Sequence, residues 1–132
     1  MASPLPQLNR TELSIMKVLW HHGKASAREV HEEISQDFDW AYSTTRTNLE
    51  RMVRKGLLRK KDFHGLFLYA PGVSKVAALA ARVKEFAEQV LELDPAPVVS
   101  LFAEGNRLSA EEIEQLERLL DEHSSGPEGA EA

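Results

Sequence analysis

The 132-residue sequence contains no cysteine. Disulfide bonds, thiol nucleophiles and thiolate metal ligands are therefore excluded, and the composition fits the reducing interior of a cell. No stretch approaches the ~20 apolar residues that a membrane span needs, and the N-terminal segment lacks the basic start and apolar run of a signal peptide. We expect a cytoplasmic protein with no membrane insertion.

Catalytic motifs are also lacking. The chain has no glycine-flanked serine and no phosphate-binding glycine loop. Residues 31–35 (HEEIS) contain only half of the H-E-x-x-H zinc motif, because Ser35 stands where the second histidine is needed. We therefore expect no enzyme, no metal site and no cofactor. A metal-dependent enzyme or a metal-responsive regulator is the alternative that the five histidines leave open, and inhibition by a chelator would reveal it.

Charge is distributed unevenly along the chain, whose net charge is -5. Residues 1–70 carry 11 Lys and Arg against 8 Asp and Glu, whereas residues 71–132 carry 5 against 13. Between residues 41 and 61 there are seven basic residues and one acid, Glu50. Local positive charge, and not the net charge, attracts a polyanion. The first half is therefore predicted to bind nucleic acid.

Three helices and a hairpin are predicted in the first half. The pairs Asn9 with Glu12 and Ser26 with Glu29 have the spacing of capping boxes, and Gly56 can end the third helix. A turn follows at residues 62–65, between two short runs of strand-forming residues. The predicted helices span about residues 9–22, 26–36 and 43–55, and the strands span 57–61 and 66–69. This order predicts a winged helix-turn-helix domain over residues 1–72 in a mostly α fold.

The third predicted helix begins at Ser43 or Thr44 and has two unlike faces. At about 100° per residue, its apolar residues cluster on one side and its polar and basic residues on the other. Such polar groups match the donors and acceptors of base edges in the major groove, so we assign Thr47 and Arg51 to base contacts. We assign the hydroxyls of Ser43 and Thr44 to the DNA backbone. The hairpin is expected to anchor phosphates. The predicted DNA-binding residues are Ser43, Thr44, Arg46, Thr47, Asn48, Arg51, Arg54, Lys60, Lys61 and His64.

The second half is predicted to be a helical dimerisation domain over residues 73–123, followed by a disordered tail at 124–132. A long helix is expected from about residue 74 to 91, a short helix follows Pro97, and Ser109 with Glu112 opens a last helix. These helices are too few to bury their apolar stripes alone, which favours pairing with a second copy. The predicted dimerisation residues are Val76, Leu79, Val83, Phe86, Val90, Phe102, Ile113, Leu116 and Leu120.

Two segments resemble the BlaI/MecI penicillinase-repressor family. Residues 8–20 are similar to its opening pattern, L-T-x-x-E-x-x-I-M-x-x-L-W, and residues 41–56 to its recognition-helix pattern, T-T-V-x-T-x-L-x-R-L-x-x-K-G. The resemblance covers about residues 8–122. It implies a homodimer that binds an inverted-repeat DNA operator and represses transcription by occluding the promoter, with control of β-lactam resistance or of a stress response.

The chain departs from the family at three places. The resemblance implies a membrane-bound sensor protease as a partner, which in better-known members leads to cleavage of an Asn-Phe bond, but the matching residues here are Leu101 and Phe102. The family's glycine-arginine at the wing tip is replaced by His64 and Gly65. The cysteines of copper-responsive relatives are absent. The remaining alternative is a winged-helix module that binds proteins, against which the basic helix face argues.

Overall fold

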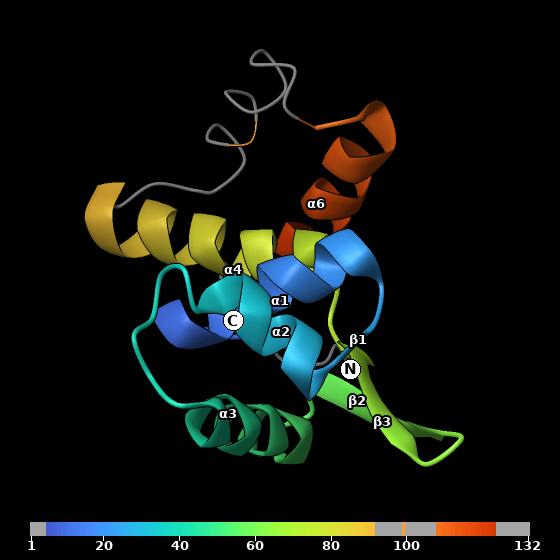
Figure 1. Cartoon of the computed structure of the whole chain (residues 1–132). Coiled ribbons are helices and arrows are strands. Elements are labelled where there is room, and N and C mark those ends of the chain that lie inside the picture. The colour runs from blue at the N-terminus through green and yellow to red at the C-terminus, as the bar shows by residue number, and fades with distance from the viewer. Residues whose placement is uncertain (1–4, 92–98, 100–107, 124–132) are drawn as a thin grey trace. The chain divides into compact units, whose positions relative to one another are not determined.

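The computed structural model describes residues 5–91, 99 and 108–123 (Figure 1). The chain divides into two compact units, Leu8–Ser74 and Met1–Gln7 with Lys75–Ala132. The elements, in chain order, are α1 (Arg10–His22), β1 (Ala25–Ser26), α2 (Ala27–Ile34), α3 (Tyr42–Arg54), β2 (Leu58–Phe63), β3 (Leu66–Pro71), α4 (Lys75–Phe86), the π-helix η1 (Ala87–Leu91) and α6 (Ala110–Glu122).

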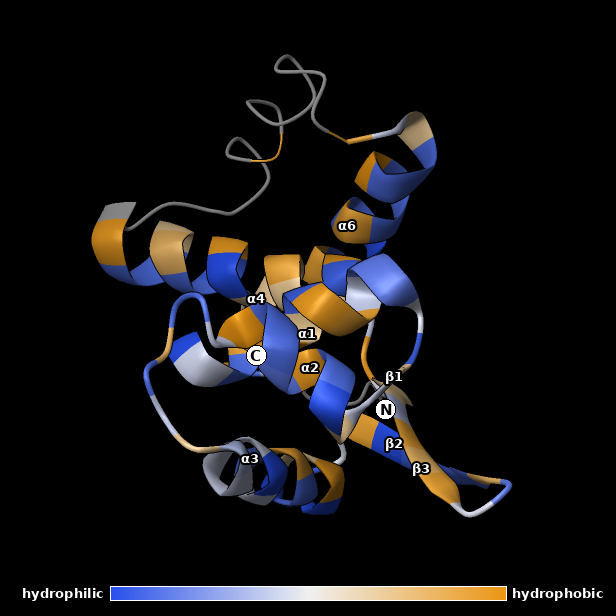
Figure 2. Cartoon of the chain, viewed as in Figure 1, coloured by the Kyte–Doolittle hydropathy of each residue, from blue (hydrophilic) through white to orange (hydrophobic). Residues whose placement is uncertain are grey.

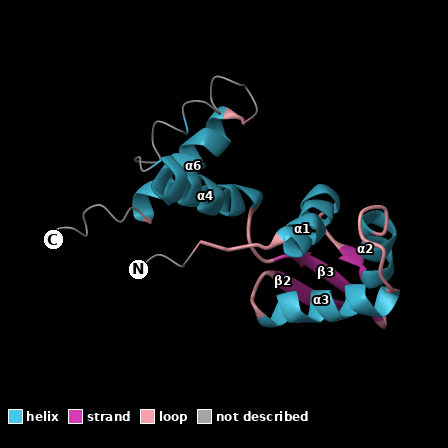
Figure 3. Cartoon of the chain, turned by 90° about the vertical axis from the view of Figure 1, so that its left-hand side faces the viewer, coloured by secondary structure: helices cyan, strands magenta, loops and turns pink. Residues whose placement is uncertain are grey.

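The unit Leu8–Ser74 contains three helices and a three-stranded antiparallel sheet in the order β1-β3-β2 (Figure 3). The hairpin β2–β3 pairs Leu58 with Pro71 at one end and Phe63 with Leu66 at the other. Only two residues connect its strands, and both have positive φ, 55° at His64 and 83° at Gly65. A two-residue turn of this kind matches the right-handed twist of the strands, and its second position suits glycine.

The predicted fold class, mostly helical with a β wing, is confirmed. α1 and α2 contact β3, α2 contacts α3, and α3 contacts β2. The centre of the unit is formed by apolar side chains from all three helices, which are at most 1% exposed: Ile15, Met16, Leu19, Val30, Leu49 and Met52. This core fixes α3 with its opposite face outward.

Local capping signals place most of the helix starts. The predicted capping boxes are present at Asn9 with Glu12 and at Ser26 with Glu29, where each cap side chain accepts from the backbone N–H three residues on and the glutamate returns the bond. The same reciprocal pair opens α6 at Ser109. These three predictions are confirmed.

The predicted start of α3 at Ser43 or Thr44 is wrong by one or two residues. The helix begins at Tyr42 after Ala41, which has no side chain able to cap. The N–H groups of Thr44 and Thr45 both donate to the carbonyl of Ala41, so the helical hydrogen bonds begin at Ala41, before Ser43. The preference for a hydroxyl at the N-cap position points to the wrong residue, because the Ala41 carbonyl accepts the first helical hydrogen bonds without help from a side chain.

Two further differences concern weak sequence signals. The two-residue strand β1, which pairs Ala25 with Tyr69 and Ser26 with Leu68, is not predicted, because two residues show no alternation. The long helix expected up to Leu91 ends at Phe86 and continues as the π-helix η1. Periodicity does not separate the two, since their hydrogen bonds differ in spacing by one residue.

The second unit packs α4 against α6. Its buried core consists of Val76, Ala80, Val83, Ala87, Val99, Leu116 and Leu120. The predicted cleavage position at Leu101 and Phe102, and the predicted tail at 124–132, lie outside the described residues. Among the residues that the structure describes, no helix is long and apolar enough to cross a membrane.

Candidate nucleic-acid interface

The polar face of α3 lies at the surface, as its periodicity predicts. Thr45, Leu49 and Met52 are buried, whereas Thr44 and Asn48 on the flank are half-buried. The exposed members of the predicted set on this helix are Ser43, Arg46, Thr47, Arg51 and Arg54. A shallow hollow on this face is lined by Ser43, Arg46, Thr47, Glu50 and Arg54. The helix therefore presents three arginines and two hydroxyls together, and their contact with DNA stays a prediction.

Hydrogen bonds within α3 hold part of this face in place. The Asn48 Nδ2 donates to the Thr44 carbonyl at 2.9 Å, and Arg51 Nη1 donates to Asn48 Oδ1 at 3.2 Å. Both the nitrogen and the oxygen of the Asn48 amide are therefore hydrogen-bonded, and the oxygen is placed to orient Arg51. The Thr47 hydroxyl donates to the Ser43 carbonyl at 3.0 Å, which leaves its oxygen lone pairs facing outward as acceptors.

Glu50 connects the helix to the hairpin. Its Oε2 accepts from the Tyr69 hydroxyl at 2.5 Å and from Lys60 Nζ at 2.9 Å. Lys60 Nζ also lies 4.3 Å from the centre of the Phe67 ring. The single acid of the basic segment is thus neutralised, and Lys60 takes part in an intramolecular network. The predicted hairpin contacts Lys61 and His64 are both exposed.

The same network shifts two pKa values. The Tyr69 hydroxyl, followed by the Lys60 ammonium, lowers the pKa of Glu50 below its ordinary value. Burial, followed by the hydrogen bond to Glu50, raises the pKa of Tyr69 above its ordinary value. Both shifts favour a charged carboxylate beside a neutral phenol at neutral pH.

This arrangement predicts a pH-dependent effect of Glu50→Gln. A carboxyl whose folded pKa is depressed contributes stability fully above its unfolded value of 4.5 and loses it as the pH falls through the lower folded value. We expect the variant to unfold at lower urea concentration than the wild type at neutral pH, and the gap to shrink well below pH 4.5. Tryptophan fluorescence would follow the unfolding. The exposed Glu32→Gln is the control, and a gap that stays constant with pH would contradict the expectation.

One basic residue near this surface is missed by the sequence analysis. The Arg28 guanidinium lies 4.2 Å from the centre of the Tyr42 ring and is exposed. Arg28 lines a second hollow together with Tyr42 and Arg46 from α3 and with Leu66 and Phe67 from the hairpin. Its position just inside the capping box of α2, the helix that precedes α3, is the signal that points to it.

The histidines of the half zinc motif and of the α1 terminus have other partners. His31 Nδ1 lies 2.7 Å from the hydroxyl of the buried Thr45, which also accepts from Trp40 Nε1 at 3.0 Å. His22 Nε2 lies 3.6 Å from a Glu33 oxygen. Among the described residues no group of three or more His, Asp or Glu side chains is placed to hold a metal ion.

Eight of the nine predicted dimerisation residues are described, and they separate into three groups. Val76, Val83, Leu116 and Leu120 lie in the unit's own core, where at most 6% of each is exposed. Leu79 and Ile113 are partly buried against that core. Phe86 and Val90 are 47% and 63% exposed. Phe102 lies outside the described residues.

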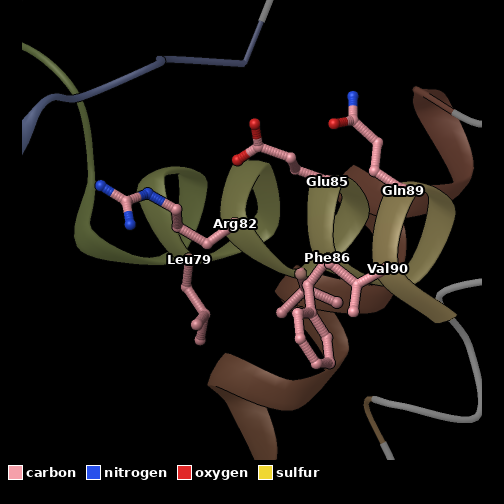
Figure 4. A pocket seen from close by; sticks show the side chains of 7 residues that line it. Leu79, Arg82, Glu85, Phe86, Gln89 and Val90 are labelled. Carbon is pink, nitrogen blue, oxygen red and sulfur yellow. The ribbon is translucent and has the colours of Figure 1, made fainter.

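An apolar surface remains on α4 and η1. The side chains of Leu79, Phe86 and Val90 project to one side of this helix, and Glu85 and Gln89 project to the opposite side (Figure 4). All five residues line one open pocket of the unit, together with Arg82 and Val83. Of the described residues in the predicted dimerisation set, Phe86 and Val90 are the most exposed, and their contact with a second chain stays a prediction.

Three helices, a small sheet with a two-residue wing turn, and an exposed cationic α3 define a winged helix-turn-helix protein. The model of the penicillinase repressor family matches residues 8–122, and the chain belongs to this family. The family consists of DNA-binding transcriptional repressors and not of enzymes, as expected. The family assignment made from residues 8–20 and 41–56 is confirmed.

Known proteins show how far the likeness extends. The penicillinase repressor of Bacillus licheniformis is 31% identical over 121 residues, which cover 92% of this chain and 94% of that protein. The methicillin resistance regulatory protein MecI of Staphylococcus aureus is 30% identical over 115 residues, or 87% and 94%. The solution structure of monomeric Bacillus licheniformis BlaI in complex with the blaP half-operator shares 32% identity with a TM-score of 0.50, covering 56% of this chain and 90% of that one.

Proposed function

We propose that this chain is a cytoplasmic, sequence-specific repressor that binds an inverted-repeat operator in double-stranded DNA as a homodimer. The observation that carries the proposal is the exposed basic face of α3, held beside the hairpin by the bonds of Glu50 to Tyr69 and Lys60. An exposed recognition helix of this kind enters the major groove. The complex of monomeric BlaI with a half-operator supports one half-site per copy.

The residues divide by the part of DNA that each is placed to contact. Arg51 and Thr47 present donors and acceptors at the centre of the α3 face and contact base edges. Ser43 and Thr44, at the start of the helix, contact the backbone, where hydroxyls and helix N-terminal amides bind phosphate. Phosphates flanking the groove are bound by Arg46, Arg54, Lys61 and His64.

The homodimer forms through the helical unit. Phe86 and Val90 expose large apolar side chains on one side of the helix, with Leu79 nearby. A monomeric protein seldom leaves such a surface exposed without a binding role. Two-fold pairing would bring two copies of α3 to the two halves of an operator. Control by a sensor protease would need an enzyme that accepts Leu101 before Phe102 in place of asparagine.

Two substitutions test the assignment of base and phosphate contacts. Arg51→Ala should weaken binding to the specific operator by about 1 to 3 kcal/mol, because it removes a base contact, and should leave random-sequence binding nearly unchanged. Lys61→Ala should weaken binding to both duplexes equally and reduce the slope of log affinity against log salt by about 1. Fluorescence anisotropy on a duplex selected from bound genomic fragments would measure both.

Lys17→Ala is the matched control, since Lys17 is an exposed cation on α1. Its affinity for both duplexes should equal that of the wild type. If Lys61→Ala lost affinity for the selected duplex alone while Arg51→Ala lost it for both, the two roles would have to be exchanged. A wild-type protein without affinity for any duplex would refute the proposed function itself.

A further inference from the structure

The end of the hairpin exposes three large apolar side chains. Phe63 is 55% exposed, Leu66 53% and Phe67 50%. We call these three residues the wing edge. β3 is apolar over most of its length (Figure 2). Phe63 ends β2 and Leu66 begins β3, so the wing edge lies beside the two-residue turn of the hairpin. Isolated exposed apolar residues are ordinary, but three large ones beside a single two-residue turn are not isolated.

The strand register places the wing edge on both faces of the hairpin. Phe63 and Leu66 are paired across the strands and therefore share a face, whereas Phe67 follows Leu66 and points to the other face. The apolar surface thus wraps around the end of the hairpin. Packing of one face against the unit's own core would still leave the other face in water.

Positive charge surrounds the wing edge. Arg59, Lys61 and Phe63 are two residues apart on β2 and therefore share one of its faces. On the other face, Lys60 lies over the Phe67 ring. Leu66 and Phe67 also line the hollow that contains Arg28 and Arg46.

The nearby acids are already engaged. Asp62 Oδ1 accepts from the Gly65 N–H at 3.0 Å, and the Glu50 carboxylate accepts from Tyr69 and Lys60. The surface is therefore apolar and cationic at once.

The DNA backbone has the complementary chemistry. It alternates anionic phosphates with deoxyribose groups, whose carbon edges are apolar. We propose that the wing edge packs on deoxyribose groups of the DNA backbone while Arg28 and Arg46 bind the phosphates beside them. This contact rests on the proposed function and adds to it a sequence-independent apolar contact that cations alone do not supply. It assigns a role to Arg28 and to Phe63, which the groove-facing side of α3 does not include.

The experiment separates apolar from ionic contributions by their salt dependence. Only neutralised phosphates release counterions, so an apolar contact changes affinity without changing the salt slope. We expect Phe63→Ser and Leu66→Ser each to weaken binding of the full chain to a random-sequence duplex by roughly fivefold to twentyfold, with the slope unchanged. Arg28→Ala should instead reduce the slope by about 1. Anisotropy titrations at several salt concentrations would measure both quantities.

Phe63→Leu restores an apolar side chain and should recover most of the affinity, while Lys17→Ala should change neither affinity nor slope. Thermal unfolding of each variant confirms that the exposed positions leave the fold intact. Unchanged affinity in both serine variants would overturn the proposal. Failure of the wild type to bind any duplex would instead refute the proposed function, so the two failures are distinct.

Discussion

Leu49→Ala is expected to lower the free energy of unfolding of the Leu8–Ser74 unit by about 2 to 5 kcal/mol. Leu49 is 0% exposed and anchors the buried face of α3, so its truncation leaves a cavity among α-helical core residues. Both tryptophans of the chain, Trp20 and Trp40, lie in this unit. Urea unfolding followed by tryptophan fluorescence therefore reports on the DNA-binding unit alone.

Thr47→Ala is the matched control on the same helix. Its side chain is exposed, and alanine is a better helix former, so the free energy of unfolding should change by no more than about 0.5 kcal/mol. A loss below about 1 kcal/mol for Leu49→Ala would mean that α3 is not held by this face, contrary to the structure.

Phe86→Asp is expected to raise the dissociation constant of the homodimer at least about thirtyfold. A central aromatic contact is commonly worth 2 kcal/mol or more, and a carboxylate at its place adds the cost of burying an unpaired charge. Phe86 is 47% exposed within its own unit, so the substitution should spare the monomer fold. Sedimentation velocity over a range of protein concentrations would measure the shift.

DNA binding gives the second readout for this variant. Affinity for a duplex with two half-sites should fall, while affinity for a single half-site should stay near the wild-type value, because the winged-helix unit is untouched. Arg118→Asp is the control, since Arg118 is exposed on α6 and does not line the pocket that contains Phe86. A wild-type protein that is monomeric at all concentrations, or a Phe86→Asp protein that remains dimeric, would contradict the proposed interface.

Much of the fold is predictable because its signals are local. The capping boxes at Asn9 and Ser26 each depend on residues three apart, and the hairpin turn depends on the conformational freedom of Gly65. The bonds of Glu50 to Tyr69 and Lys60 are not predictable in the same way. They depend on how α3 packs beside the hairpin. Lys60 is ten residues and Tyr69 nineteen residues from Glu50 along the chain, and no local pattern encodes either contact.

The site shows the same limit. Helical spacing correctly separates the buried Leu49 from the exposed Arg51, since both positions follow from 100° per residue. It does not show that Asn48 uses its amide to bridge Thr44 and Arg51. Periodicity likewise places Val83 and Phe86 on one apolar stripe of a helix without indicating which chain covers them. Of these two residues, the structure buries only Val83 within its own unit.

The carboxylate of Glu50 links α3 to both strands of the hairpin, through Lys60 on β2 and Tyr69 on β3. These two hydrogen bonds favour one separation between the helix and the hairpin. A duplex whose adjacent grooves do not match this separation must bend or narrow to fit, and the energy of that deformation depends on base steps that no side chain touches. The preference of this protein for particular operators would thus be determined partly by the stiffness of the DNA.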